Sequence, residues 1–308
     1  MRLLVVGAGS TGGYFGGRLA QAGRDVTFLV RAARAARLRQ SGLRILSPHG
    51  DATLPPKIVT PETLAGTYDA VLLTVKAYQL EAAMEDFAPA VGPETMILPV
   101  LNGMRHMDLL AQRFSPHNLV GCAAKVSATL DDDGRVVQLA TMQSLTYGEL
   151  DGEPTPRMAA LDEFMRAAPI GAQLSPAIRR EMWEKWVFLA SLAAINCLTR
   201  GTIGEVEACP GGAAFALRML DEVVAIVAAV GVAPSAGLLA GARAMLTEKG
   251  SHLAASMFRD LQGGKPTEAE AIVGDLIRRG AKVGVNAPLL SAAYVCLAVH
   301  QNRIGAAR

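Results

Sequence analysis

Several features are scarce in this sequence of 308 residues, and each scarcity excludes a class of protein. The four cysteines, Cys122, Cys197, Cys209 and Cys296, form neither a CxxC pair nor a disulfide framework, which predicts a reduced, cytoplasmic setting. The five histidines lack the spacing of metal ligands, so we expect no metal site. A net charge of +2, without basic segments interleaved with aromatic residues, argues against a nucleic-acid partner.

Long hydrophobic runs are also missing. The longest apolar stretches, residues 187–198 and 223–232, are too short to span a bilayer, so we expect buried helices and no membrane partner. The sequence starts its first strand at once, without the apolar region and cleavage site of a signal peptide. A hydrophobic content of 51% with 19% charged residues is typical of a globular protein, here long enough for two domains.

A glycine-rich segment near the start is the most informative feature that is present. It follows an apolar run at residues 3–6, precedes an amphipathic stretch at 14–22, and reads Gly7, Ala8, Gly9, Ser10, Thr11 and Gly12. The first glycine permits a tight turn, the second lets the backbone approach a pyrophosphate, and the third lets the helix pack on the strand. The helix N-terminus adds free N–H groups and partial positive charge. These six residues therefore predict dinucleotide binding rather than a chance glycine-rich turn.

The end of the second strand, residues 26–30, lacks an acidic residue. An NAD site usually carries Asp or Glu about twenty residues after the glycines, to bind the ribose 2′-OH. Arg31 stands there instead, and the next acid is Asp51. A cation suits a 2′-phosphate, so we predict NADP(H) as cofactor and Arg31 as one of its ligands. Three more arginines follow, Arg34, Arg37 and Arg39, for which a solvated helix face is the alternative.

The chain has two halves of different character. Up to about residue 175, helical stretches alternate with short β-branched runs, the later of which cover residues 70–75, 95–101, 119–126, 136–139 and 145–147. This alternation predicts an α/β domain with a parallel-rich sheet and helices on both faces. A polar loop at 148–156 and a helix at 157–168 complete this half. We therefore assign residues 1–175 to a Rossmann-type dinucleotide-binding domain.

The second half has helical periodicity almost throughout. Ser175 and Pro176 form a helix start, with a serine cap and proline at the first helical position. The helices we expect cover residues 177–200, 212–230, 235–248, 267–283 and 287–301. Residues 176–308 are thus predicted to form an all-α domain, with the substrate site where the two domains meet. Its apolar helices are compatible with a homodimer surface or with core.

Lys185 is the first candidate for chemistry. It lies beside Trp183 and Trp186 at the start of a helix that then runs apolar for three turns. Desolvation there would lower its pKa and allow it to give a proton to a developing alkoxide. The alternative is a lysine that extends its ammonium group to water along an apolar face.

Three further residues have a functional and a purely structural interpretation. Glu268 lies in the first turn of a helix capped by Thr267, where glutamate is common for structural reasons alone. Asn102 and Lys76 each follow a predicted strand, on the carboxyl edge where open α/β sheets bind ligands. Asn102 precedes glycine, and this pair is also a common turn.

The candidates occur in one order along the chain. The glycine segment is followed by Leu72–Gln79 (LLTVKAYQ), then Leu101-Asn102-Gly103-Met104, Trp183-Glu184-Lys185, and Ser256-Met257-x-x-Asp260 with Thr267-Glu268. This order and spacing resemble ketopantoate reductase (2-dehydropantoate 2-reductase) over essentially the whole chain. The resemblance implies NADPH-dependent reduction of a 2-keto acid, most simply ketopantoate to (R)-pantoate in pantothenate synthesis.

The resemblance also implies roles for single residues. Lys185 would be the general acid, and Glu268 would hold a substrate hydroxyl and border the cofactor. Asn102 would lie where nicotinamide meets substrate, Lys76 near the cofactor, and Ser256 at the substrate carboxylate. Glu268 and Asn102 thus count among both the cofactor and the reaction-site residues.

One departure from the family pattern concerns the lysine helix. The family usually has asparagine four and eight residues after the lysine, whereas Leu189 and Ala193 stand there. The Asn-x-Leu-Thr context reappears at Asn196, which eleven residues of straight helix place about 16 Å from Lys185 along the axis. A bulge in the helix would bring Asn196 back toward the substrate, so we include it among the substrate-binding residues.

Two other functions remain open on the sequence. A related 2-keto acid reductase or hydroxyacid dehydrogenase would use the same lysine with a different substrate. A non-catalytic NADPH-sensing module would bind the cofactor and a partner protein, but retention of Lys185 and Glu268 argues against it. The enzymatic interpretations predict a small-molecule 2-keto acid as the partner.

Overall fold

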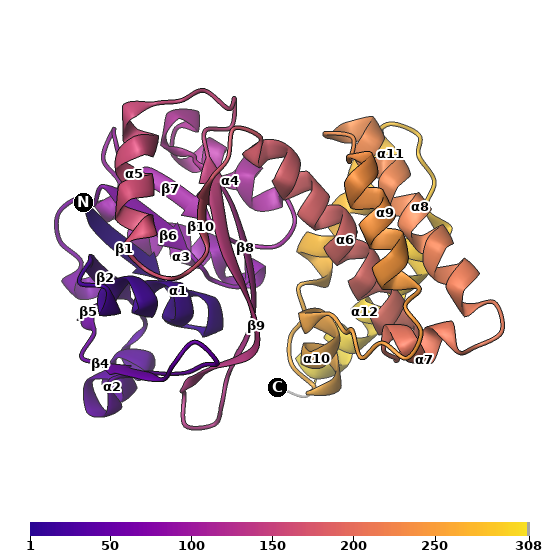
Figure 1. Ribbon diagram of the computed structural model, residues 1–308, viewed down its shortest axis with the longest axis horizontal. Coiled ribbons are helices and arrows are strands. Elements are labelled where there is room, and N and C mark those ends of the chain that lie inside the picture. Colours follow the sequence, from indigo (N-terminus) through magenta and orange to yellow (C-terminus); the bar gives the residue numbers. More distant parts are fainter. Residues whose placement is uncertain (307–308) are drawn as a thin grey trace. The chain divides into compact units, whose positions relative to one another are not determined.

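The computed structural model describes residues 1–306, which divide into two compact units. The first unit comprises residues 1–101 and 106–179, and the second comprises residues 102–105 and 180–306 (Figure 1). The short segment at 102–105 thus packs with residues of the second unit, although it follows a strand of the first unit in the sequence. This exchange brings Asn102 into the helical unit.

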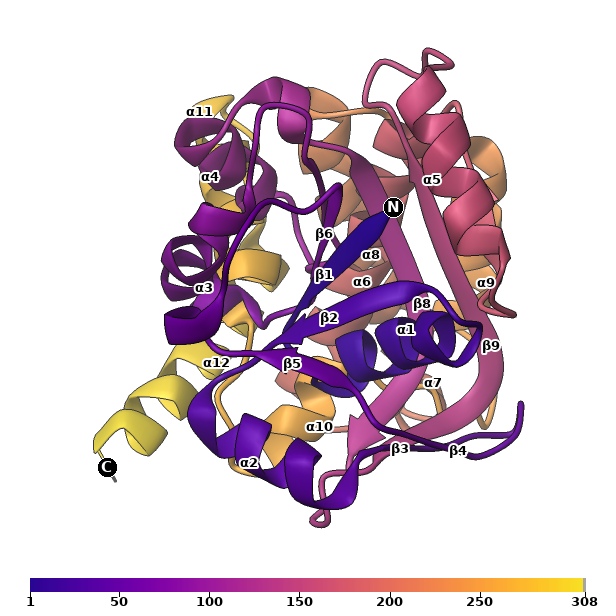
Figure 2. The ribbon, with the colours of Figure 1, turned by 90° about the vertical axis from the view of Figure 1, so that its left-hand side faces the viewer.

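The first unit is built on a parallel sheet of five strands in the order β5-β2-β1-β6-β7. These strands are β1 (Arg2–Val6), β2 (Asp25–Leu29), β5 (Lys57–Val59), β6 (Ala70–Leu73) and β7 (Met96–Pro99). All four residues of β6 are buried, so side chains on both faces of the sheet are covered. Its helices are α1 (Ser10–Gln21), α2 (Ala32–Ser41), α3 (Leu80–Phe87), α4 (Arg105–Arg113) and α5 (Pro156–Arg166). Figure 2 shows α3 and α4 on the opposite side of this sheet from α1.

A second, mixed sheet in the same unit differs from the sequence-based expectation. It contains β3 (Leu43–Leu46), β4 (Ala52–Leu54), β8 (Gly121–Leu130), β9 (Val136–Gly148) and β10 (Ala172–Leu174). The two strands predicted at 136–139 and 145–147 are parts of one long strand, β9, paired antiparallel to β8. The prediction failed because the middle of β9 is exposed and lacks the apolar pattern from which a strand is recognised.

Helix α1 packs between these two sheets, and its glycines make this close approach possible. A Cβ on Gly16 would lie 2.9 Å from the Val5 side chain in the first sheet. A Cβ on Gly17 would lie 2.7 Å from the Ile45 side chain in the second. The buried core of the unit accordingly combines apolar residues from both sheets with those of α1 and α5.

The second unit is helical, as the sequence predicts. Its helices are α6 (Ile178–Thr199), which begins at the end of the first unit, α7 (Ile203–Glu207), α8 (Gly212–Val230), α9 (Ala236–Leu246), α10 (Ser256–Gln262), α11 (Asp275–Lys282) and α12 (Pro288–Ala306). The helix expected at 267–283 contains a π-helical turn, Glu270–Gly274, directly before α11. The short helices α7 and α10 were not predicted. An α/β Rossmann-type unit is thus followed by an all-α unit.

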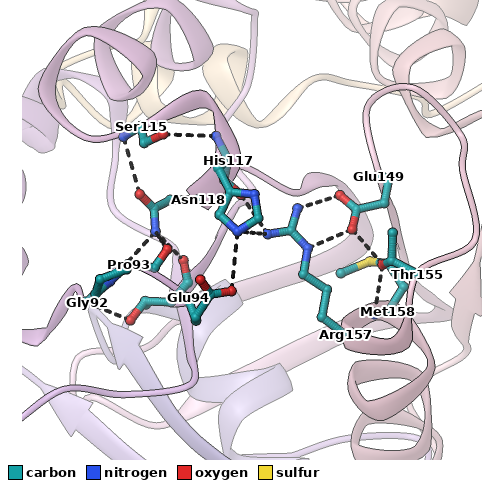
Figure 3. Close-up of polar contacts among 11 residues, drawn as sticks. Gly92, Pro93, Glu94, Ser115, His117, Asn118, Glu149, Thr155, Arg157 and Met158 are labelled. Atoms are coloured by element: carbon teal, nitrogen blue, oxygen red, sulfur yellow. Dashed lines mark hydrogen bonds and ion pairs between the residues drawn. The ribbon is translucent and has the colours of Figure 1, made fainter.

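A polar network ties the loops of the first unit together (Figure 3). Arg157, on α5, donates two hydrogen bonds of 2.6 Å to the carboxylate of Glu149, which follows β9. Its Nη1 also donates to the backbone oxygen of His117 at 2.6 Å, and Thr155 donates to Glu149 at 2.7 Å. The Arg157 hydrogen bonds hold the pKa of Glu149 below its usual range, against the effect of burial. This network fixes the start of α5 against two loops.

Within residues 1–306, no helix combines the length and apolarity needed to cross a membrane. The same range contains no group of three or more His, Cys, Asp or Glu side chains able to hold a metal ion.

Candidate active site

The glycine-rich segment forms the turn between β1 and α1. Gly7 has a φ of +94°, a conformation that side chains disfavour. A Cβ on Gly12 would lie 2.1 Å from the Gly7 carbonyl oxygen and 2.2 Å from Thr74 Oγ1, so only glycine fits there. Thr74, just after β6, donates hydrogen bonds of 2.8 Å to the carbonyl oxygens of Val6 and Gly7. The turn is thus locked from the neighbouring strand.

The middle of this turn is open. No atom lies within 4 Å of the position that a Cβ on Gly9 would take, so a ligand can approach the backbone there. Gly9 is the N-cap of α1 and makes no side-chain cap, and the first turn carries no acidic residue. The N–H groups and the helix dipole therefore favour an anion such as a pyrophosphate.

Arg31 follows β2 at the N-cap of α2. Its side chain is exposed and makes no hydrogen bond or ion pair with any residue in the described range 1–306. A guanidinium group in this position is available to an added phosphate.

Arg34 is the unexpected residue of this region. Its Nε donates to the Ala8 carbonyl oxygen at 3.1 Å and its Nη1 to that of Gly134 at 3.0 Å, while its buried Nη2 has no hydrogen-bond partner. Burial, with the nearby charge of Arg37, lowers the pKa of Arg34, although a guanidinium group remains charged at neutral pH. Arg34 is therefore no solvated side chain, and its orphaned donor beside the glycine turn is a second feature that fits an anionic cofactor.

Lys76 lies in the same unit, three residues after β6, and is half-exposed. It is the N-cap of a short 3-10 turn, Ala77–Gln79. Thr74, two residues earlier, binds the glycine turn, so Lys76 follows the same strand end that supports the dinucleotide fingerprint.

In the second unit, Asn102 and Glu268 meet although 166 residues separate them in the chain. Asn102 Nδ2 donates to Glu268 Oε2 at 3.3 Å, and the Glu268 residue is only 6% exposed. Gly103 has a φ of +82°, and a Cβ on it would lie 2.3 Å from the Ala271 carbonyl oxygen. The Asn-Gly turn therefore packs directly on the segment that follows Glu268.

Lys185 is half-buried on α6, flanked by two buried tryptophans. The ring centroids of Trp183 and Trp186 lie 5.4 Å apart. Trp186 Nε1 donates to the Ile272 carbonyl oxygen at 2.9 Å, inside the π-helical turn. This bond fixes the lysine helix to the Glu268 segment, and π-helical turns are frequent at functional sites.

Asn196 occupies a different environment from the one expected. Helix α6 runs without a bulge from Ile178 to Thr199, so the predicted bulge is absent. The Asn196 side chain is fully buried, and its Nδ2 donates to the Gly201 oxygen at 2.8 Å. Its Oδ1 accepts the Ala255 N–H at 2.9 Å, immediately before Ser256. Asn196 therefore fixes the start of α10, where Ser256 is half-buried.

The structure thus brings several predicted residues together within each unit. Thr74, which follows β6, binds the glycine turn at the end of β1, and Lys76 follows Thr74 in the same loop. Arg31 follows β2, which pairs with β1. Asn102 contacts Glu268, and Trp186 links the lysine helix to the same segment. Sequence reasoning missed the contacts of Thr74, Arg34 and Trp186, because each partner lies far away in the chain.

A dinucleotide-type turn on a Rossmann-type unit, followed by a helical unit with a lysine, an asparagine and a buried glutamate, defines a class: nucleotide-dependent oxidoreductases of small molecules. The chain belongs to the ketopantoate reductase family. Residues 3–152 match the ketopantoate reductase PanE/ApbA domain, and residues 177–301 match the C-terminal domain of the same family.

Individual relatives agree with this assignment. The chain is 33% identical over 302 residues to the oxidoreductase YkpB of Bacillus subtilis, covering 98% of this chain and 99% of that one. It is 28% identical to 2-dehydropantoate 2-reductase of Mesorhizobium japonicum, covering 95% of each. The crystal structure of 2-dehydropantoate 2-reductase from Geobacter metallireducens superposes with a TM-score of 0.86 at 26% identity, covering 96% of this chain and 99% of that one. The protein is accordingly an NADP-dependent oxidoreductase that acts on 2-keto acids.

Proposed function

We propose that this protein reduces ketopantoate to (R)-pantoate, with Lys185 as proton donor. The observation that carries the proposal is the partly buried Asn102–Glu268 pair, in a chain of the ketopantoate reductase family. A carboxylate offers about four lone-pair sites, so Glu268 can accept a substrate hydroxyl in addition to the Asn102 amide. Ketopantoate carries such a hydroxyl, whereas simple 2-keto acids do not.

Of the remaining residues, some bind the cofactor and others contact the substrate. The backbone of residues 7–12 and the Arg31 and Lys76 side chains hold NADPH. When bound, NADPH supplies the hydride that is added to C2 of the keto acid. Lys185 gives its proton to the C2 oxygen as the alkoxide forms. Ser256 binds the substrate carboxylate.

Two contacts support these assignments further. Trp186 anchors the Lys185 helix to the Glu268 segment, so proton donor and hydroxyl acceptor belong to one rigid arrangement. Asn196 holds the Ala255 amide and so sets the position of Ser256. We therefore assign Asn196 to the substrate site as a positioning residue rather than as a direct ligand.

A second substrate is favoured by a specific observation. Leu189 is half-buried and Ala193 fully buried at the offsets where the family usually has asparagines. An apolar side chain there suits a bulkier, more apolar 2-keto acid. Leu189→Asn should then shift the preference toward ketopantoate.

The test is NADPH oxidation with ketopantoate and with trimethylpyruvate, which differs only in lacking the hydroxyl. Because a site built to bind a hydroxyl rejects the analogue that lacks it, kcat/KM should favour ketopantoate by about 10²-fold or more. Glu268→Gln should narrow this ratio. Glu248→Gln removes an exposed carboxylate of the same unit, one that accepts a hydrogen bond from Ser251, and should leave the ratio unchanged. A wild type indifferent to the hydroxyl would contradict the proposal, and preference for an apolar keto acid would support the second substrate.

A further inference from the structure

An ion-pair cluster lies beside the Asn102–Glu268 contact, and the proposed function does not use it. Arg105, three residues after Asn102, places its Nη1 3.6 Å from Glu270 Oε1. Glu270 is two residues after Glu268 and begins the π-helical turn. The same two chain segments therefore meet at Asn102–Glu268, at the close approach of Gly103, and at Arg105–Glu270.

Glu270 is itself held from two other helices. Arg278, on α11, lies 2.5 Å from Glu270 Oε1, and the Tyr294 hydroxyl of α12 donates to Oε2 at 2.6 Å. Although partial burial acts to raise the pKa of Glu270, these hydrogen bonds and the charges of Arg278 and Arg105 lower it below its ordinary value. The carboxylate is thus ionised at neutral pH and fixed in direction.

The cluster cannot be explained by stability alone. The Arg105 and Glu270 side chains are 41% and 48% exposed, and exposed ion pairs contribute little to the free energy of unfolding. Their position is nevertheless specific, because they join the two ends of a contact between a turn and a π-helical segment. An arrangement of this kind restricts geometry more than it adds stability.

We propose that Arg105 and Glu270 are positioning residues that hold the Asn102 side chain against Glu268. The inference rests on the proposed function, in which Asn102 and Glu268 contact the substrate. Without the ion pair, the turn at 102–105 would lose one of the contacts that hold it on the Glu268 segment, beside its backbone packing and the 3.3 Å amide bond. The Asn102 amide that directs the Glu268 carboxylate would then be less well fixed, while the Trp186 bond between α6 and the Glu268 segment would remain.

The first experiment compares Arg105→Ala with the wild type in steady-state kinetics. Because small displacements of a substrate-positioning group are costly, kcat/KM for ketopantoate should fall about tenfold. The ratio of kcat/KM for ketopantoate to kcat/KM for trimethylpyruvate should decrease, whereas a general loss of structure would lower kcat/KM for both substrates alike. Arg105→Lys keeps the charge and should recover most of the loss, to within about threefold of wild type.

Arg243→Ala is the matched control. Arg243 forms a 2.6 Å ion pair with Asp221 in the same unit, with side chains 46% and 55% exposed. Its removal should leave kcat/KM and substrate preference unchanged. If Arg105→Ala behaves like Arg243→Ala, the positioning role is wrong.

A second readout does not depend on turnover. Hydrogen exchange measured by mass spectrometry should show faster exchange of the amides in the turn at residues 102–105 in Arg105→Ala, and wild-type rates there in Arg243→Ala. Unchanged exchange in Arg105→Ala would overturn the inference. A wild type that reduces no 2-keto acid would refute the proposed function, while the exchange measurement would still decide whether Arg105 orders this segment.

Discussion

The chemistry of a single lysine is the sharpest question at the scale of residues. Lys185 is half-buried on α6, and the nearby Trp183 and Trp186 are 5% and 1% exposed, so the lysine belongs to a largely buried part of the helix. The proposed function uses this lysine as the proton donor. The proposed function assigns Asn102 and Glu268 instead to holding the substrate. The proposal therefore assigns proton transfer to Lys185 alone.

Lys185→Ala should lower kcat by about 10²–10⁴-fold, the usual effect of removing a proton-transfer group. NADPH affinity should change little, because the residues assigned to the cofactor are in the other unit, apart from Asn102 and Glu268. Single-turnover kinetics and NADPH fluorescence titration measure the two quantities separately. If kcat survives and only KM rises, Lys185 binds the substrate and another group donates the proton.

At the scale of elements, the strand-turn-helix motif at residues 1–21 was predictable because its determinants are local. Glycine spacing, an apolar strand and an amphipathic helix all lie within one stretch, and the structure confirms them. Helix α8 also has the predicted bounds, Gly212–Val230. Helix periodicity and a glycine at either end suffice for such an element.

Other elements depend on partners far away in the chain. The centre of β9, residues 139–142, is exposed and lies at an irregularity of the ladder with β8, between the pairs Val126–Gln143 and Ala128–Gln138. The pairing with β8 on both sides of this centre joins the two ends of β9 into one strand. The π-helical turn at Glu270–Gly274 carries no recognisable pattern, and its carbonyl contact comes from Trp186, 86 residues earlier. Asn196 was placed near the substrate by analogy, but the Gly201 and Ala255 backbone groups that bind it could not be inferred from helical spacing.

The network that anchors α5 leads to a prediction about pH. Because Arg157 lowers the pKa of Glu149 in the folded protein below the ordinary value of 4.5, the pair stabilises the fold at neutral pH. This stabilisation is complete above the pKa of the unfolded carboxyl and is lost as the pH falls through the lower, folded pKa. Arg157→Ala should therefore reduce the free energy of unfolding by about 1–3 kcal/mol at pH 7, since it leaves a buried carboxylate without its cation.

Urea denaturation followed by circular dichroism, repeated at decreasing pH, measures this difference. The gap between wild type and Arg157→Ala should shrink below the ordinary glutamate pKa of 4.5, as Glu149 becomes protonated. Arg113→Ala removes an arginine from an exposed pair with Glu85 and should change stability little at either pH. A gap that is independent of pH would show that Arg157 acts through packing or through the His117 carbonyl alone.

At the scale of the whole molecule, cofactor binding at the glycine turn should increase the stability of the native protein. A ligand that binds only the native state stabilises it by about 2.7 kcal/mol at one hundred times its Kd. For a unit of 150–250 residues this corresponds to a rise in Tm of about 5–11 °C. The proposed function assigns the exposed Arg31 to the 2′-phosphate of NADPH, a group that NADH lacks.

NADPH should therefore raise the Tm more than NADH does at the same concentration, as measured by differential scanning fluorimetry. Arg31→Ala should bring the NADPH shift down toward the NADH shift, because the two cofactors then meet the same glycine turn. Arg39→Ala, an exposed arginine on the same helix, is the control and should keep the wild-type difference. If Arg31→Ala and Arg39→Ala both keep the wild-type difference between the NADPH and NADH shifts, the buried Nη2 of Arg34 becomes the group to test. Equal shifts with NADPH and NADH in the wild type would contradict selection of the 2′-phosphate by any of these arginines.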